Sequence, residues 1–141
     1  TSNKSWKNKP FFTPNYNLKK AYSKDGINWK TSSKFLLNKD ISKEIAITRP
    51  WVIKIKEKKI LFYSYKNYKN KGRNYKIGFA ENYKNQWKRK DNKLLFKKSS
   101  NNFDKNMQEY ASVIKYDNEF FMFYNGDNYG QRGIGLAKLL K

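Results

Sequence analysis

The sequence predicts an all-β protein built from small antiparallel sheets, and three observations lead to this fold class. A run at 52–64 returns 61 residues later at 113–125, and both copies begin Val-Ile-Lys. Aromatic residues form 18% of the chain, which is enough for a packed core of strands. Short β-rich runs are separated by polar turns, a pattern typical of proteins made of sheets alone.

The first repeated unit is a β-hairpin. In each copy an apolar run, a polar tip and a second apolar run that ends in Phe-Tyr follow one another. The polar tips lie at 57–59 and 117–119. Two β-rich runs around a short polar tip indicate a hairpin, so we expect two paired strands in each copy.

The second repeated unit is a strand with a glycine inside it. Residues 75–80 end in Ile-Gly-Phe-Ala and return 57 residues later at 132–137, which end in Ile-Gly-Leu-Ala. An earlier copy, without the glycine, lies at 17–23. A glycine inside a strand indicates a bend or the close approach of another chain segment, so we expect one of these at Gly78 and Gly135.

Four short strands in about 60 residues make up a unit the size of a β-propeller blade. We therefore expect residues 1–141 to form a single partial propeller domain. In it, 17–36 are the outer two strands of one blade, 48–97 a complete blade and 109–140 most of the next. The expected strands of the complete blade are 48–55, 59–66, 75–81 and 86–96. A turn of helix is expected only at 38–46.

Two questions about the architecture stay open. The same strands can form a free-standing β-sandwich, although the 61-residue recurrence favours blades. About two blades cannot close a ring, and repeat units need neighbours to bury their faces. We therefore expect the missing blades to come from the rest of a longer chain or from other copies of it.

The composition excludes several classes of function. The chain has no Cys and no His, which excludes disulfides, Cys/His zinc sites, His-based triads and Cys nucleophiles. Its 11 Asp and Glu residues do not cluster, so we expect no metal and no cofactor. No apolar run is long enough for a membrane span, and the polar start at Thr1 does not resemble a signal peptide, so the cytoplasm is favoured over export.

A formal net charge of +21 raises the question of nucleic-acid binding. Only 4 of the 32 basic residues are Arg, the side chain best suited to bidentate recognition of phosphates and bases. The lysines are spread along the chain together with 18 Asn, as expected for an AT-rich bacterial genome. This argues against nucleic acid as the partner. Binding of an anionic polymer through a Lys-rich surface remains an alternative.

Several motifs resemble one family of propeller proteins. They are Ala21-x-Ser23-x-Asp25-Gly26-x-x-Trp29, Arg49-Pro50-x-Val52, the Ile-Gly-x-Ala strands and the segment 124–130. Together they resemble the five-bladed glycoside hydrolases of the arabinanase, levansucrase and invertase superfamily, most of all its uncharacterised bacterial branch. The resemblance covers about residues 17–138 and implies a glycan or oligosaccharide partner more firmly than it implies hydrolysis.

The resemblance leaves two functions open. One is that of a glycosidase, which hydrolyses a glycan in the central funnel of the propeller. The other is that of a non-catalytic, carbohydrate-binding accessory propeller, since a related propeller occurs beside glycosyltransferases. An incomplete set of carboxylates favours the second, and a complete set favours the first.

The resemblance also implies where catalytic carboxylates lie, which is at the starts of the innermost strands. In the 61-residue repeat Arg49 corresponds to Tyr110, the neighbour of Glu109, so Arg49 and Glu109 are expected at similar depth in the funnel. Glycoside hydrolysis uses two carboxyl groups. Glu109 is the candidate proton donor and Asp104 the second candidate. Glu109 lacks the small residue and Pro that follow the family's acid, and a surface Glu and a turn Asp are the alternatives.

Arg49 is the candidate anion-binding group of the site. Its planar guanidinium suits a substrate carboxylate, a phosphate or a catalytic carboxylate that needs orienting. Most aromatic residues are expected in the core, but some can offer a face to a sugar. The predicted substrate-binding residues are Arg49, Trp51, Tyr110, Asn125, Asp127 and Tyr129.

Overall fold

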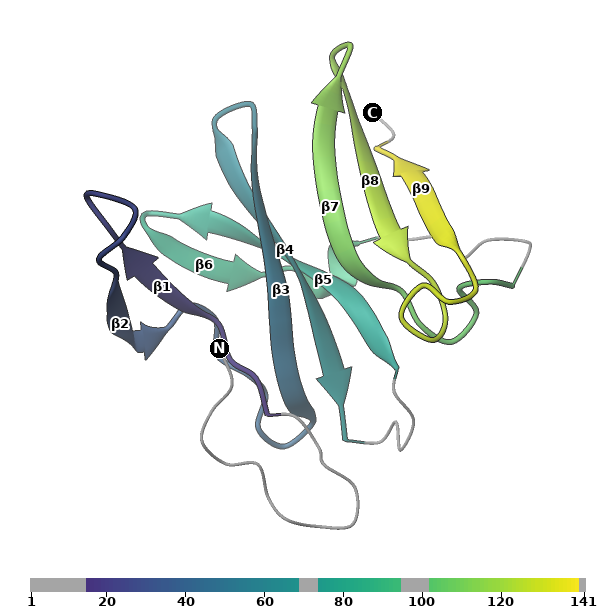
Figure 1. Cartoon of the computed structure of the whole chain (residues 1–141), viewed down its shortest axis with the longest axis horizontal. Coiled ribbons are helices and arrows are strands. Elements are labelled where there is room, and N and C mark those ends of the chain that lie inside the picture. The colour runs from purple at the N-terminus through teal and green to yellow at the C-terminus, as the bar shows by residue number, and fades with distance from the viewer. Residues whose placement is uncertain (1–14, 69–73, 95–101, 140–141) are drawn as a thin grey trace.

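The computed structural model describes residues 15–68, 74–94 and 102–139, and Figure 1 shows their arrangement. Within these ranges nine strands and one short 3₁₀ helix form three separate antiparallel sheets. The all-β prediction is therefore confirmed. No helix in the described ranges is long and apolar enough to cross a membrane.

Each sheet is formed by strands that follow one another in the sequence. The two-stranded sheet contains β1 (Lys19–Tyr22) and β2 (Lys30–Phe35). The four-stranded sheet contains β3 (Glu44–Ile55), β4 (Lys58–Asn67), β5 (Tyr75–Tyr83) and β6 (Gln86–Arg89). The three-stranded sheet contains β7 (Glu109–Tyr116), β8 (Glu119–Asn125) and β9 (Ile134–Lys138). Small antiparallel sheets of consecutive strands are consistent with propeller blades.

The start of β3 differs from the prediction. The strand begins at Glu44 instead of residue 48, so the turn of helix expected over 38–46 is wrong for its last three residues. What remains before the strand is one hydrogen-bonded turn, in which the Glu44 N–H donates to the Asp40 carbonyl over 2.7 Å. The strand starts early because Ile45 and its neighbours are buried, and an extended chain places them against the core.

The end of β6 also differs from the prediction. The strand expected over 86–96 stops at Arg89, and the chain continues as the 3₁₀ helix η1 (Asp91–Lys93). The chain leaves the sheet because the Asp91 carboxylate accepts the Phe79 N–H over 3.0 Å, which draws the chain across β5. Residues 95 and 96 lie outside the described residues.

The hairpins β3–β4 and β7–β8 share one irregularity, which confirms the 61-residue repeat in three dimensions. The pairing register shifts between Thr48 and Trp51 in the first hairpin and between Glu109 and Ser112 in the second. Arg49 and Tyr110, at the equivalent positions, have positive φ values of 50° and 58°. Residues other than glycine rarely adopt this conformation, and a bulge that enforces it changes the direction of a side chain.

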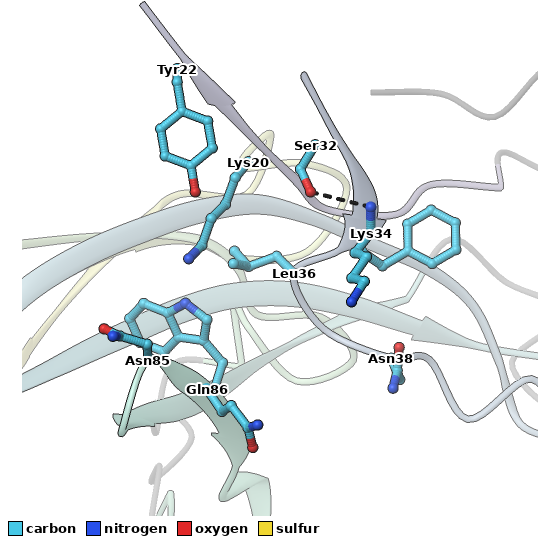
Figure 2. A pocket seen from close by; sticks show the side chains of 10 residues that line it. Lys20, Tyr22, Ser32, Lys34, Leu36, Asn38, Asn85 and Gln86 are labelled. Carbon is cyan, nitrogen blue, oxygen red and sulfur yellow. Dashed lines mark hydrogen bonds between the residues drawn. The ribbon is translucent and has the colours of Figure 1, made fainter. Parts of the chain in front are cut away.

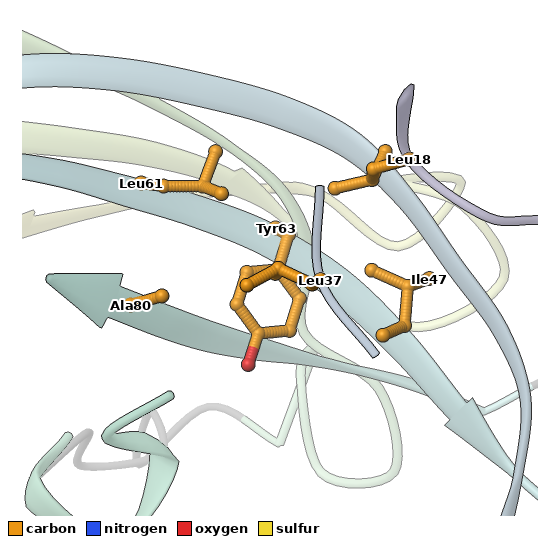
Figure 3. Close-up of a cluster of buried hydrophobic side chains, with 6 residues drawn as sticks. All are labelled: Leu18, Leu37, Ile47, Leu61, Tyr63 and Ala80. Atoms are coloured by element: carbon orange, nitrogen blue, oxygen red, sulfur yellow. The ribbon is translucent and has the colours of Figure 1, made fainter. Parts of the chain in front are cut away.

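One face of the four-stranded sheet packs against the two-stranded sheet. Figure 3 shows the buried side chains between them, which are Leu18, Leu37, Ile47, Leu61, Tyr63 and Ala80. The opposite face packs against β7 and its neighbours through a second buried cluster of Ile77, Ala111, Val113, Met122 and Tyr124. The Trp51 Nε1–H donates to the Val113 carbonyl over 2.8 Å and links these two sheets directly. Because both of its faces are covered, β4 is a nearly continuous buried strand.

Gly78 and Gly135 each lie beneath a buried tyrosine ring. A Cβ atom on Gly78 would lie 2.8 Å from the ring of Tyr63, and one on Gly135 would lie 2.1 Å from the ring of Tyr124. The two hydroxyl groups hold the rings in place, since each donates to an aspartate carboxylate, over 2.5 Å and 2.9 Å. The close approach predicted from the repeat is confirmed at both glycines.

A buried ion pair ties the two ends of the four-stranded sheet together. Arg89 donates to both carboxylate oxygens of Glu44 over 2.7 and 2.6 Å, and to Asp91 over 3.0 and 2.6 Å. Burial acts to lower the pKa of Arg89, but the carboxylates outweigh it and raise the pKa above its usual value. The sequence analysis did not identify this network, because Arg89 and Glu44 lie 45 residues apart.

Candidate functional site

Glu109 is held at the first position of β7 by hydrogen bonds from both of its neighbours. The Gln108 N–H donates to the Tyr75 carbonyl over 3.2 Å, and the Tyr110 N–H donates to the buried Ser64 hydroxyl over 2.8 Å. Both acceptors belong to the four-stranded sheet. The carboxyl group of Glu109 therefore lies where two sheets meet, and the backbone around it is fixed.

The Glu109 carboxyl group is completely buried, with 0% of the residue exposed. Neither of its oxygens has a hydrogen-bond partner among the described residues. Burial raises the pKa of Glu109 to about 7, although the Tyr110 hydroxyl and the Arg49 charge both act to lower it. A surface glutamate, the alternative considered above, does not match this position.

Arg49 and three tyrosines surround this carboxyl group's strand position. The Arg49 guanidinium lies over the ring of Tyr110, 4.9 Å from its centroid. The rings of Tyr75, Tyr110 and Tyr129, which we call the tyrosine cluster, have centroids 6.2 to 6.4 Å apart. The structure thus brings together four predicted site residues: Arg49, Glu109, Tyr110 and Tyr129. Burial raises the pKa of Tyr110 to about 12, so this hydroxyl stays protonated at neutral pH.

Tyr75 belongs to this site but was not predicted. Its ring contacts Tyr110 and Tyr129, and the Lys66 ammonium lies over it at 5.8 Å. Burial and the neighbouring tyrosines raise its pKa above the usual value. In the sequence Tyr75 is one of eleven tyrosines and has no distinguishing motif, so only the folded chain reveals its position.

Asp104 and Asp127 are engaged in hydrogen bonds within the fold. Asp104 is fully buried and accepts the Tyr124 hydroxyl over 2.9 Å. Asp127 accepts the N–H groups of Asn106 and Met107 over 2.9 and 2.8 Å, and the Asn106 side-chain amide over 2.9 Å. Burial opposes ionisation of Asp127, but these donors outweigh it and hold the pKa of that carboxyl below its usual value. Both aspartates thus fix the segment that leads into β7.

Two further predicted residues make hydrogen bonds inside the fold. The Asn125 side-chain amide donates to the Tyr129 carbonyl over 3.1 Å, which closes the turn after β8. The Trp51 indole is bonded to β7, as described above, but about two fifths of the residue stays exposed. Asn125 therefore positions Tyr129, while Trp51 keeps a face that a ligand can contact.

A separate groove of about 400 Å³ lies away from this site. It runs between the two-stranded sheet and the β5–β6 turn, and Figure 2 shows its lining. The lining residues are Lys20, Tyr22, Ser32, Lys34, Phe35, Leu36, Asn38, Asn85, Gln86 and Trp87. None of the predicted site residues lines this groove. No group of three or more acidic side chains that could hold a metal occurs among the described residues.

Comparison with known proteins places the fold. No family model matches the sequence. Two solved structures are similar: one described as a glycoside hydrolase, with a TM-score of 0.63, and one described as a complex of BT0996 and RGII, with a TM-score of 0.59. Each is 24% identical to this chain and covers 86% of it. The fold is glycoside hydrolase-like.

Two curated relatives come from strains of Mycobacterium tuberculosis. They are the uncharacterised proteins Rv1502 and MT1551, each 27% identical over 123 residues, or 86% of this chain. This chain spans only 40% of the length of these relatives, and 35% of each solved structure. The similarity therefore concerns one part of larger proteins.

Proposed function

We propose that this chain is part of a carbohydrate-active β-propeller, whose glycan site lies at Glu109, Arg49 and the tyrosine cluster. The three sheets are then consecutive blades, and β3 and β7 are innermost strands. The glycoside hydrolase-like fold supports a carbohydrate ligand. The observation that carries the proposal is Glu109, a buried carboxyl group whose two oxygens have no partner among the described residues. Such a group is available to a ligand and calls for an explanation beyond folding.

The chemistry that suits Glu109 is proton donation to the leaving oxygen of a glycosidic bond. A general acid has to be protonated near neutral pH, and the pKa of Glu109, raised by burial to about 7, meets this condition. Arg49 favours the carboxylate that remains after the proton has left. The exposed side of the Tyr129 ring can stack on a sugar.

The second carboxylate of a glycosidase is the unmet requirement. It has to activate a water molecule or attack the sugar, and it needs a free oxygen for this. Asp127 accepts three hydrogen bonds and Asp104 accepts one from Tyr124, so both serve the fold. In the hydrolytic proposal the second carboxylate comes from outside the described residues. If there is none, the second candidate function applies, which is glycan binding without catalysis.

An assay of sugar release by the complete gene product tests the proposal. We expect wild-type protein to release reducing sugar from one member of an oligosaccharide panel and Glu109→Gln to lose at least a hundredfold of this activity, about 3 kcal/mol of transition-state stabilisation. Glu119→Gln is the matched control, because Glu119 is half-exposed and pairs only with Lys138 among the described residues. Unchanged turnover in Glu109→Gln would remove the acid role.

The same panel separates hydrolysis from binding. Sugar binding without release, with affinity lost on Tyr129→Ala, supports the non-catalytic candidate. Absence of both release and binding across the panel contradicts a carbohydrate function. Both variants have to show wild-type circular dichroism for these outcomes to count.

A further inference from the structure

The sheets of this protein use equivalent faces in the same way. Leu61 and Tyr63 of the four-stranded sheet pack against the two-stranded sheet. Their equivalents 61 residues later, Met122 and Tyr124, pack against the four-stranded sheet. An alanine on the following strand, Ala80 or Ala137, accompanies each pair. Each sheet thus turns the same face toward the sheet that precedes it in the sequence.

The opposite face of each sheet is directed toward the sheet that follows. Leu18, Ile77 and Ile134 occupy one repeat position, 59 and then 57 residues apart. Leu18 is 5% exposed and Ile77 is 8% exposed, because the next sheet covers each of them. Ile134 is 70% exposed. The third copy therefore lacks the cover that the first two copies have.

The uncovered face of the three-stranded sheet is continuous and apolar. Phe123 on β8 pairs with Leu136 on β9, and Asn125 pairs with Ile134, so these side chains lie side by side. The large exposed apolar residues of this sheet face are Ile114, Tyr116, Phe123, Ile134 and Leu136. Soluble proteins rarely leave such a surface in water, and a contiguous patch of this kind marks a contact site.

We propose that this face is covered by a further antiparallel sheet of the same repeat, carried by the same polypeptide. By the packing described above, the covering sheet presents a Leu or Met, a Tyr two residues later, and an Ala on the next strand. The relatives from Mycobacterium tuberculosis are matched over only 40% of their length, so such proteins contain chain for further repeats. A second copy of this chain offers no free face of this kind, because the corresponding faces of its two larger sheets are already buried.

Thiol labelling of the complete natural polypeptide tests whether the face is covered. The chain described here has no cysteine, so Leu136→Cys introduces a single reporter on the face within it. Ile41→Cys is the matched control, since Ile41 is 81% exposed in a turn outside the sheets. We expect a maleimide to react with Leu136→Cys at least about tenfold more slowly than with Ile41→Cys. Equal rates would overturn the proposal.

A second pair of variants identifies what covers the face. In the complete protein we expect Ile134→Lys to lower Tm by roughly 5 °C or more, because it buries an unpaired charge, and Ile41→Lys to leave Tm unchanged. Light scattering has to show a monomer. An oligomer that Ile134→Lys dissociates would assign the cover to a second copy and overturn the proposed occupant. The inference does not depend on a carbohydrate function, so loss of either leaves the other standing.

Discussion

At the scale of single residues, the buried Glu109 carboxyl group links stability to pH. Its pKa is about 7 in the folded protein and about 4.5 in an ordinary glutamate. Between these values the unfolded chain releases a proton that the folded protein keeps, so rising pH favours unfolding. We expect the free energy of unfolding to fall by up to about 3 kcal/mol over this window and to level off above it.

Chemical denaturation at a series of pH values measures this effect. Glu109→Gln removes the titrating group, so its stability relative to wild type should increase from about pH 5 to about pH 8. Glu119→Gln changes a half-exposed glutamate and should keep the wild-type pH dependence. If Glu109→Gln and wild type change in parallel across the window, Glu109 ionises normally in the folded protein.

The sequence alone predicted the identity of this residue better than its state. The repeat placed Glu109 beside Tyr110, the equivalent of Arg49, and the structure shows Arg49 over the Tyr110 ring. The burial of Glu109 was not predictable, because it depends on residues that meet only when two sheets pack. The same holds for Asp104, which is bonded to Tyr124, 20 residues away.

At the scale of the strand, two glycines are required by the tyrosines that lie over them. We expect Gly135→Ala to cost about 2 to 4 kcal/mol, because its Cβ would lie 2.1 Å from the hydrogen-bonded ring of Tyr124. Gly78→Ala should cost a similar amount beneath Tyr63. Gly26→Ala is the control: it has a positive φ of 75° but nothing within 4 Å, so about 1 kcal/mol is expected.

Urea denaturation of the three variants checks this prediction, with the midpoint and slope both recorded. The predicted order is a large loss for Gly78→Ala and Gly135→Ala and a small one for Gly26→Ala. A similar small loss in all three would mean that the tyrosine rings move aside without cost. In that case the recurrence of glycine at this repeat position would need another explanation.

The strands themselves were largely predictable because they repeat. The copy of β3–β4 at β7–β8 has the same pairing and the same register shift, and alternating apolar residues indicated both hairpins. The end of β6 was not predictable, since it depends on Asp91 accepting an N–H from β5. Repeats therefore predict what recurs, and they miss contacts that occur in one copy alone.

At the scale of the whole molecule, the net charge of +21 provides a test between glycan binding and binding of anionic polymers. Attachment to a polyanion through many lysines releases counterions, so its affinity falls steeply with salt. Binding of a neutral oligosaccharide at the tyrosine cluster releases none. We expect polyphosphate to lose at least about tenfold in affinity between low and physiological salt, and the bound oligosaccharide to lose almost none.

Arg49→Ala makes this test specific to the site. The variant removes one of 32 basic residues, so polyphosphate binding should hardly change. Glycan binding should weaken several-fold, because the Arg49 guanidinium packs on Tyr110 within the proposed site. Isothermal titration of both ligands against wild type and Arg49→Ala gives the four affinities. Tight polyphosphate binding at physiological salt, with no sugar bound under any condition, would replace the glycan proposal with the anionic polymer.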